Sequence, residues 1–290
     1  MQSAAHNGVR DELGAHVSSA GSLSNAPARA AALDAAVLQL FTKQPSRWAE
    51  REISADEARA YRQATRGSGI RAAAAHDSYL INLASPDPLL RARSLDAFQR
   101  ELTRCLALRI QAVVTHLGHA TDGDVHSAIA RNAEAVQQAL EHVPRVHVLF
   151  ETTAGAGHVL GATFEQLAAL IVRIPAPLRR RIGVCFDTCH VWAAGYDLRS
   201  SYHDVMARFD DTIGCHRIRL FHLNDSLGSR GSCRDRHAHI GVGALGDETF
   251  RHLLLDERFT HVPKLLETPK DDDAVAADRR NLARLRALRT

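Results

Sequence analysis

The sequence predicts an α/β protein with one domain, a (β/α)₈ barrel of the TIM type. Short apolar runs that are typical of buried strands alternate eight times with longer segments of helical character. Strands that alternate with helices form a parallel sheet, and eight such units close into a barrel. No linker or shift in composition divides the 290 residues, and this length suits one barrel.

Each expected strand is a short, mostly apolar run that is closed by residues favouring turns. In chain order these runs are residues 13–17, 36–42, 70–75, 112–115, 146–150, 182–186, 218–221 and 263–266. The first run, for example, is followed by Ser18, Ser19 and Gly21. The polar residues 1–12 precede it and are expected to be loose, so the barrel domain is expected to span residues 13–290.

Each expected helix follows one of these strands and carries apolar residues at helical spacing. In chain order the helical segments are residues 25–34, 54–65, 86–108 with a leading loop, 127–141, 163–172, 204–209, 247–255 and 276–288. Ser54 is expected to cap the second helix, because a serine hydroxyl can accept a hydrogen bond from the first turn. Pro45 and Ser46 interrupt the pattern before it, which predicts a loop over residues 43–48.

The composition is that of an ordinary folded protein, with 45% hydrophobic and 24% charged residues. No apolar run approaches the roughly 20 residues that cross a bilayer, so no membrane partner is expected. The five cysteines form an odd-numbered set, which argues against a disulfide framework and for a reducing cytoplasm. A net charge of +3 is only weak evidence for a polyanionic partner.

Histidine and acidic side chains follow six consecutive expected strands, from the third to the eighth. In a barrel the carboxyl ends of all strands meet at one face, and that face carries the chemistry. The candidates at these ends are His76, His116, Glu151, Asp187, His190, His222 and Glu267. Asp235 and His237 lie in the loop after the seventh strand and complete a set of five histidines and four carboxylates.

Four carboxylates in a partly desolvated site repel one another unless a positive charge lies between them. Divalent cations provide that charge, and histidine with carboxylate suits zinc or manganese. Nine ligands are too many for one ion, so two or three ions are expected. Neighbouring ions can hold the attacking and leaving oxygens of a phosphoryl displacement. The residues alone therefore predict a multinuclear metallohydrolase, most naturally a phosphodiesterase.

Three long motifs resemble those of a known family. They read HDSYLINL at residues 76–83, GVCFDTCH at 183–190 and HLNDSLGSRGSCRDRHAHIGVG at 222–243. The chain resembles the endonuclease IV family of apurinic/apyrimidinic (AP) endonucleases from residue 13 to about residue 271. The resemblance implies a TIM barrel with three zinc ions that cuts duplex DNA on the 5′ side of an abasic site. The expected products are a 3′-hydroxyl and a 5′-deoxyribose phosphate, and blocked 3′ ends are also expected substrates.

The resemblance also implies roles for individual residues. The first zinc would be held by His76, His116 and Glu151, the second by Glu151, Asp187, His222 and Glu267, and the third by His190, Asp235 and His237. Glu151 would be the catalytic residue, bridging the first two ions and orienting the attacking hydroxide. Manganese is possible at one site.

The expected partner is double-stranded DNA with abasic sites or blocked 3′ ends, bound by a monomer. The residues expected to contact it are Tyr79, Gln44, Arg47 and Arg236. The chain departs from the family pattern at three positions near the DNA. Leu227 stands where a lysine is usual, Thr152 replaces an asparagine, and Ser46 lies where some members place a long basic side chain.

Two other functions fit the residues less well. A sugar isomerase or epimerase of the xylose-isomerase-like barrels would use one metal on Glu151, Asp187, His222 and Glu267, and the other five candidates would have no role. A DNA-damage binding protein that no longer cuts would be expected to lack at least one ligand, and all nine are present.

Overall fold

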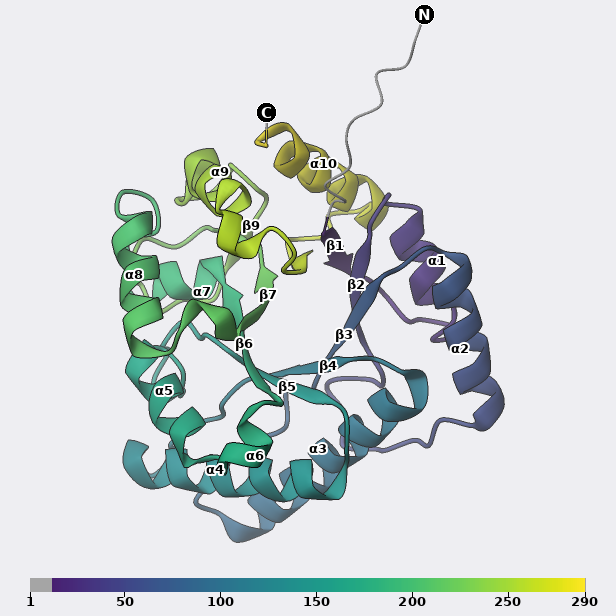
Figure 1. The fold of residues 1–290 in the computed structure, drawn as a ribbon, viewed down its shortest axis with the longest axis vertical. Helices are drawn as coiled ribbons and strands as arrows, with labels where there is room; N and C mark the ends of the chain where they lie inside the picture. Colours follow the sequence, from purple (N-terminus) through teal and green to yellow (C-terminus); the bar gives the residue numbers. More distant parts are fainter. Residues whose placement is uncertain (1–11, 290) are drawn as a thin grey trace, which may run out of the picture.

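Eight parallel strands close into a barrel, and the strand order around it follows the chain (Figure 1). The computed structural model describes residues 12–289. The barrel strands are β1 (Leu13–His16), β2 (Val37–Phe41), β3 (Ala72–His76), β4 (Ala112–Thr115), β5 (His147–Glu151), β6 (Ile182–Asp187), β7 (Ile218–His222) and β10 (Lys264–Leu266). Pairing of β1 with both β2 and β10 closes the sheet. The predicted (β/α)₈ barrel is confirmed, with every expected strand in place.

Helices surround the barrel on its outside, as Figure 1 shows. They are α1 (Asn25–Ala31), α2 (Ala55–Gly67), α3 (Pro88–Leu108), α4 (Val125–His142), α5 (Phe164–Arg173), α6 (Ala176–Arg179), α7 (Thr188–Ala193), α8 (Tyr202–Thr212), α9 (Gly246–Leu255) and α10 (Ala274–Ala287), with 3₁₀ turns η1 (Cys215–Arg217) and η2 (Glu257–Phe259). The predicted cap is confirmed, because the Ser54 hydroxyl accepts a hydrogen bond from the backbone N–H of Glu57 at 3.1 Å. The expected loose segment 1–12 lies outside the described residues except for Glu12.

Six short elements were not predicted: α6, α7, η1, η2 and the two strands of a hairpin, β8 (Asp225–Ser226) and β9 (His237–Ala238). Elements this short carry no measurable hydrophobic period, so the sequence pattern could not reveal them. The predicted strands also stop one residue early at four places. The last residues of the four strands, which take part in the sheet ladder, are His76, Glu151, Asp187 and, at the end of β7, His222.

The strand register inside the barrel brings the polar residues at the strand ends into one layer. One buried apolar layer fills the barrel, made by Val37, Ala74, Val114, Leu149, Cys185, Leu220 and Leu265. Side chains two residues apart on a strand point to the same face. The residues two positions further on therefore form the next inward layer, and they are Gln39, His76, His116, Glu151, Asp187, His222 and Glu267. The fold thus stacks a polar layer directly on an apolar floor.

Among residues 12–289, no helix is both long enough and apolar enough to cross a membrane. All five cysteines are free thiols, and only Cys233 is exposed. The absence of disulfides within the described chain agrees with the odd number of cysteines in the sequence.

Candidate metal centre

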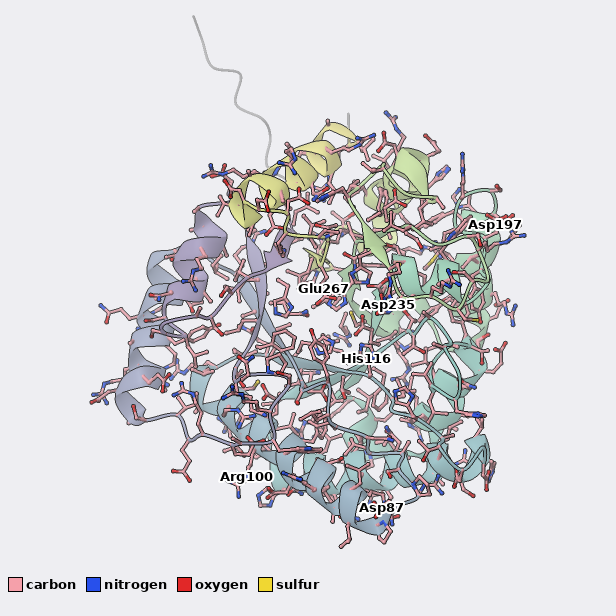
Figure 2. All side chains as sticks on the ribbon, turned by 180° about the vertical axis from the view of Figure 1, so that it is seen from behind. Asp87, Arg100, His116, Asp197, Asp235 and Glu267 are labelled. Carbon is pink, nitrogen blue, oxygen red and sulfur yellow. The ribbon has the colours of Figure 1, made fainter. Side chains whose placement is uncertain are left out.

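The nine predicted ligands come together at the carboxyl end of the barrel. In Figure 2 the labelled Glu267, Asp235 and His116 lie over the middle of the barrel, whereas Asp87, Arg100 and Asp197 lie at its periphery. The nine ligands fall into three groups, two of which share Glu151, and the potential ligand atoms of each group lie within 4.8 Å of one another. These groups are the three sets that the sequence resemblance implied.

The first group is centred on one carboxylate oxygen of Glu151. The Nε2 atoms of His76 and His116 both lie 3.1 Å from Glu151 Oε2. Glu151 and His76 are buried, while His116 is partly open to solvent. This group therefore has one side that a substrate could approach.

The second group uses the other oxygen of the same carboxylate. His222 Nδ1 lies 2.8 Å from Glu151 Oε1, 3.3 Å from Glu267 Oε2 and 3.8 Å from Asp187 Oδ2. His222, Glu151 and Asp187 are completely buried. Because Glu151 faces both groups with different oxygens, it can bridge two ions.

The third group joins α7 to the hairpin after β7. Asp235 places Oδ2 at 3.2 Å from His190 Nε2 and Oδ1 at 3.2 Å from His237 Nε2. His237 Nε2 also lies 3.8 Å from Asp187 Oδ2, which links this group to the second. The Asp235 side chain is 54% exposed, so this group is the most accessible of the three.

The orientation of the histidines fits metal ligation. His76, His190 and His237 each donate Nδ1–H to a backbone carbonyl oxygen, those of Asp77, Thr152 and Glu267, at 3.0, 2.8 and 3.0 Å. This fixes the tautomer and leaves Nε2 as an electron-pair donor. Within the described residues, Nε2 of His190 and Nε2 of His237 are buried and lack a hydrogen-bond partner.

The spacing of the donor atoms also fits metal ions. Two ligands at about 2.1 Å from a tetrahedral zinc ion stand about 3.4 Å apart. The imidazole–carboxylate distances given above run from 2.8 Å for His222 and Glu151 to 3.8 Å for His222 and Asp187. Imidazole and carboxylate donors suit zinc or manganese. The residues present therefore fit two or three divalent ions.

The charges in the cluster support the same conclusion. Burial opposes protonation of the histidines, but the hydrogen bond to Glu151 raises the pKa of His76 to about 10, and Asp235 raises the pKa of His237 to about 9. Burial would raise the pKa of Glu151, but the neighbouring imidazoles hold that pKa well below its usual range. Without metal, protons thus provide the positive charge that the carboxylates require, and divalent ions would replace them.

Two thiols lie close to the cluster. Cys185 Sγ groups with Glu151 and His222, and Cys189 Sγ groups with Asp187 and His237. Burial raises the pKa of the Cys185 thiol well above its usual range and that of Cys189 to about 12. Cys185 belongs to the apolar floor below the ligand layer. Both thiols are therefore weaker candidates than the nine predicted ligands.

The structure reveals supporting residues that were not predicted from the sequence. Gln39 accepts a hydrogen bond from His222 Nε2 at 2.9 Å and donates to Glu267 Oε1 at 2.5 Å. Asn224 donates to Asp187 Oδ2 at 2.6 Å and accepts from the backbone N–H of Glu267 at 2.8 Å. Such partners orient ligands and tune their basicity. A polar residue inside the apolar run of β2 was the only sequence signal for Gln39.

Thr152 and His16 also support the ligands. The Thr152 hydroxyl accepts a hydrogen bond from the backbone N–H of Asp187 at 2.9 Å, and its carbonyl orients His190. Thr152, which departs from the expected asparagine, is thus buried beside the cluster. His16, which was not assigned as a ligand, places Nδ1 at 3.1 Å from Glu267 Oε1.

The residues predicted to contact DNA surround the cluster. Tyr79 is 68% exposed, and its ring centroid lies 6.4 Å from that of His76. Gln44 and Arg47 are exposed in the loop after β2, and Gln44 lines a cleft of about 860 Å³ that includes His16. Arg236 is exposed and adjoins Asp235 in the chain. All four side chains are exposed to solvent.

Comparison with known proteins identifies the family. A sequence model described as Xylose isomerase-like TIM barrel matches residues 27–288. Probable endonuclease 4 of Geobacter sulfurreducens is 47% identical over 270 residues, which cover 91% of this chain and 90% of that protein. The chain belongs to the endonuclease IV family.

Further members of the endonuclease IV family agree along nearly the whole chain. Probable endonuclease 4 of Chloroflexus aggregans is 45% identical over 280 residues, covering 95% of this chain and 97% of that protein. The crystal structure of endonuclease IV from Thermus thermophilus superposes with a TM-score of 0.85 at 34% identity, covering 95% of this chain and 98% of that one. The family resemblance stated from the three sequence motifs is confirmed.

Proposed function

We propose that this protein is a zinc-dependent AP endonuclease that hydrolyses the phosphodiester bond 5′ to an abasic site in duplex DNA. The products would be a 3′-hydroxyl and a 5′-deoxyribose phosphate, and blocked 3′ ends would also be cleared. The observation that carries the proposal is the bridging position of Glu151, whose two oxygens face two separate ligand groups. Membership of the endonuclease IV family supports the same reaction.

His76, His116 and Glu151 would hold one zinc ion, and Glu151, Asp187, His222 and Glu267 a second. His190, Asp235 and His237 would hold the third, and manganese is an alternative at one of the three sites. When bound, such ions lower the pKa of water and stabilise charge on phosphoryl oxygens. Glu151 would be the central catalytic group, because it is buried and its position is set by both His76 and His222.

The remaining residues would position the substrate. Tyr79 stands exposed beside His76 and would pack against the extruded abasic nucleotide, which leaves the duplex more easily than a paired one. Gln44 and Arg47, in the loop after β2, would contact the DNA next to it. Arg236 would face the phosphates beside Asp235. Binding would weaken steeply with salt, since phosphate contacts release counterions.

A sugar isomerase accounts for fewer of the observations. One ion on Glu151, Asp187, His222 and Glu267 would leave the group around Asp235, with its two buried Nε2 atoms, without a function. We further propose that the enzyme works as a monomer in the cytoplasm, a location supported by its five free cysteines.

The test is incubation of zinc-loaded protein with a duplex that contains one tetrahydrofuran abasic analogue. We expect a single nick 5′ to the analogue, with a 3′ end that a DNA polymerase extends directly. A duplex with a 3′-phosphate at a nick tests the end-clearing activity separately. A protein that holds three zinc ions per chain and leaves the abasic duplex intact would disprove the proposal.

A further inference from the structure

Asp225 is a buried carboxylate outside the nine ligands, and it is surrounded by backbone N–H groups. Its Oδ1 accepts from Ser226 at 2.8 Å and from Leu245 at 2.9 Å. Its Oδ2 accepts from Gly241 and Gly243 at 3.0 Å each and from Gly246 at 3.3 Å. Within residues 12–289 no cationic side chain forms an ion pair with Asp225, so these backbone dipoles stabilise its charge.

The donors show what Asp225 holds together. They come from both ends of one loop, which leaves the barrel after β7 and returns to it at α9. Between the ends, β8 pairs antiparallel with β9, and this places Ser226 opposite His237. The backbone N–H of Ala244 donates to the carbonyl of Ser226 at 2.7 Å and closes the return segment over the hairpin. The carboxylate is thus the centre around which this loop folds.

The glycines of the return segment are required by the same arrangement. A Cβ atom on Gly243 would come within 2.5 Å of Asp225 Oδ1 and 2.4 Å of the carbonyl oxygen of Ser226. Gly241 has a φ of +73°, a conformation that favours glycine. These contacts give a role to the HIGVG end of the third sequence motif, residues 239–243. None of those residues is a predicted metal ligand.

The loop carries two of the three ligands of the third group, Asp235 and His237. His237 is fixed on one side by the hairpin pairing and on the other by its hydrogen bond to the Glu267 carbonyl. Asp235 is exposed and has no strand of its own to hold it. Its position therefore depends on how the loop is held: the backbone N–H of Cys233 donates to the Ala193 carbonyl at 2.9 Å on one side, and Asp225 closes the return segment on the other.

We infer that Asp225 is a positioning residue for the third metal site: its carboxylate closes the loop that brings Asp235 and His237 to His190. The inference rests on the proposed metal centre when it is tested by metal affinity. It does not rest on that proposal when it is tested by proteolysis of the metal-free protein. Loss of the Asp225 charge would open the loop and weaken the third site, while the first and second groups, which lie on barrel strands, would keep their ions.

The experiment compares Asp225→Asn with the wild-type protein. The amide keeps the size of the side chain but replaces one acceptor oxygen with a donor that faces backbone N–H groups. We expect one zinc ion per chain to be bound about 10- to 100-fold more weakly, as for other residues that support metal ligands. Adding zinc in excess should restore the full metal content and the incision rate. A variant that retains three ions with wild-type affinity would overturn the inference.

The second readout needs no metal. The loop contains three exposed arginines, Arg230, Arg234 and Arg236, at which trypsin can cut. We expect metal-free Asp225→Asn to be cleaved there at least several-fold faster than metal-free wild type, at a temperature where both remain folded. Equal cleavage rates would also overturn the inference. If wild type itself bound fewer than three ions, the proposed function would fail while this comparison stayed valid.

Two further variants separate positioning from general stability. Gly243→Ala leaves Asp225 in place but pushes a methyl group against its carboxylate, so it should reproduce both effects. Asp197→Asn serves as a control, because Asp197 pairs with Arg230 on the outer side of the same loop and does not contact Asp225. This control should retain wild-type metal affinity. If Asp197→Asn lost the third ion as readily as Asp225→Asn, the special role of Asp225 would be refuted.

Discussion

Gln39 Oε1 accepts a hydrogen bond from His222 Nε2 at 2.9 Å, so the other ring nitrogen of His222 faces Glu151. The same amide donates to Glu267 through its nitrogen. One side chain on β2 therefore orients two ligands of the second group, which come from β7 and from the end of β10. Hydrogen bonds between side chains of different strands thus orient the polar layer of the barrel.

This relationship predicts the effect of Gln39→Ala. The loss of both hydrogen bonds should weaken zinc binding at the second group about 10- to 100-fold, because the imidazole and the carboxylate are no longer oriented. Competition with a chelator, followed by metal analysis, measures the change. Gln138→Ala on the exposed face of α4 is the matched control and should bind zinc like wild type. Unchanged affinity in Gln39→Ala would show that packing alone orients His222.

Glu151→Gln should reduce incision of an abasic duplex to the background level. The amide retains the shape of the side chain but removes its negative charge and one of the two acceptor oxygens that face His76 and His222. Single-turnover incision and metal content should be measured on the same sample. Near-normal turnover in this variant would refute the bridging role of Glu151.

Asp187→Ala and His190→Ala should deplete different ions, although the two residues are only one helical turn apart. Asp187 ends β6 beside His222, whereas His190 lies on α7 and points Nε2 at Asp235. Each variant should lose one zinc ion, and the double variant should lose two. Metal analysis together with spectroscopy of a cobalt-substituted protein distinguishes the sites. Identical spectra for the two single variants would contradict the assignment.

Zinc binding should release protons at neutral pH. In the metal-free site the pKa of His76 is about 10 and that of His237 about 9, both above the value of about 6.5 for a free imidazole. These two imidazoles therefore stabilise the metal-free fold fully below pH 6.5, and this contribution is lost as the pH rises through 9 to 10. Zinc affinity should rise with pH over the same range.

Titration calorimetry at pH 7.5 in buffers of different ionisation enthalpy measures the number of protons released. Thermal unfolding of metal-free protein between pH 6.5 and 10 measures the stability. Zinc binding without proton release, or a metal-free fold whose stability does not fall at alkaline pH, would contradict the prediction.

Leu227→Lys should strengthen DNA binding and make it more sensitive to salt. Leu227 is 68% exposed on the hairpin that carries Asp235 and His237, where an added cation would approach the phosphates. One new phosphate contact steepens the slope of log K against log salt by about 0.9. Leu89→Lys is the control, since Leu89 is 81% exposed at the start of α3, next to Asp87 at the periphery of the barrel (Figure 2). Equal slopes in the two variants would show that Leu227 does not face DNA.

Much of the fold and of the site followed from the sequence for a simple reason. Strands of a parallel barrel are buried on both faces, so they read as continuous apolar runs, and eight such runs were recognised. A charged or imidazole group at the end of such a run is unusual, which made Glu151 and Asp187 visible as candidates. The family resemblance then implied three groups for the nine candidates, and the structure brings the same residues together.

The supporting residues could not be found in this way. Gln39 is one polar residue in a buried strand, and Asn224 is one of several polar residues in its motif. Their role is visible only in the folded barrel, where Gln39 and Asn224 reach ligands on other strands. Asp225 is a clearer case still, because its five N–H donors are spread from Ser226 to Gly246 and only the closed loop brings them to one carboxylate.

The sequence by itself thus determined the number and order of the barrel strands and the nine candidate ligands, and its long motifs indicated the family. Local patterns carry this information, since the period of a strand and the residue that ends it depend on neighbouring positions alone. Only the tertiary structure decided which nitrogen of each histidine faces the cluster and which side chains orient the ligands. It also brought five backbone N–H groups of the loop to the carboxylate of Asp225. These features depend on distances between atoms that are far apart in the chain, and they are set when the barrel closes.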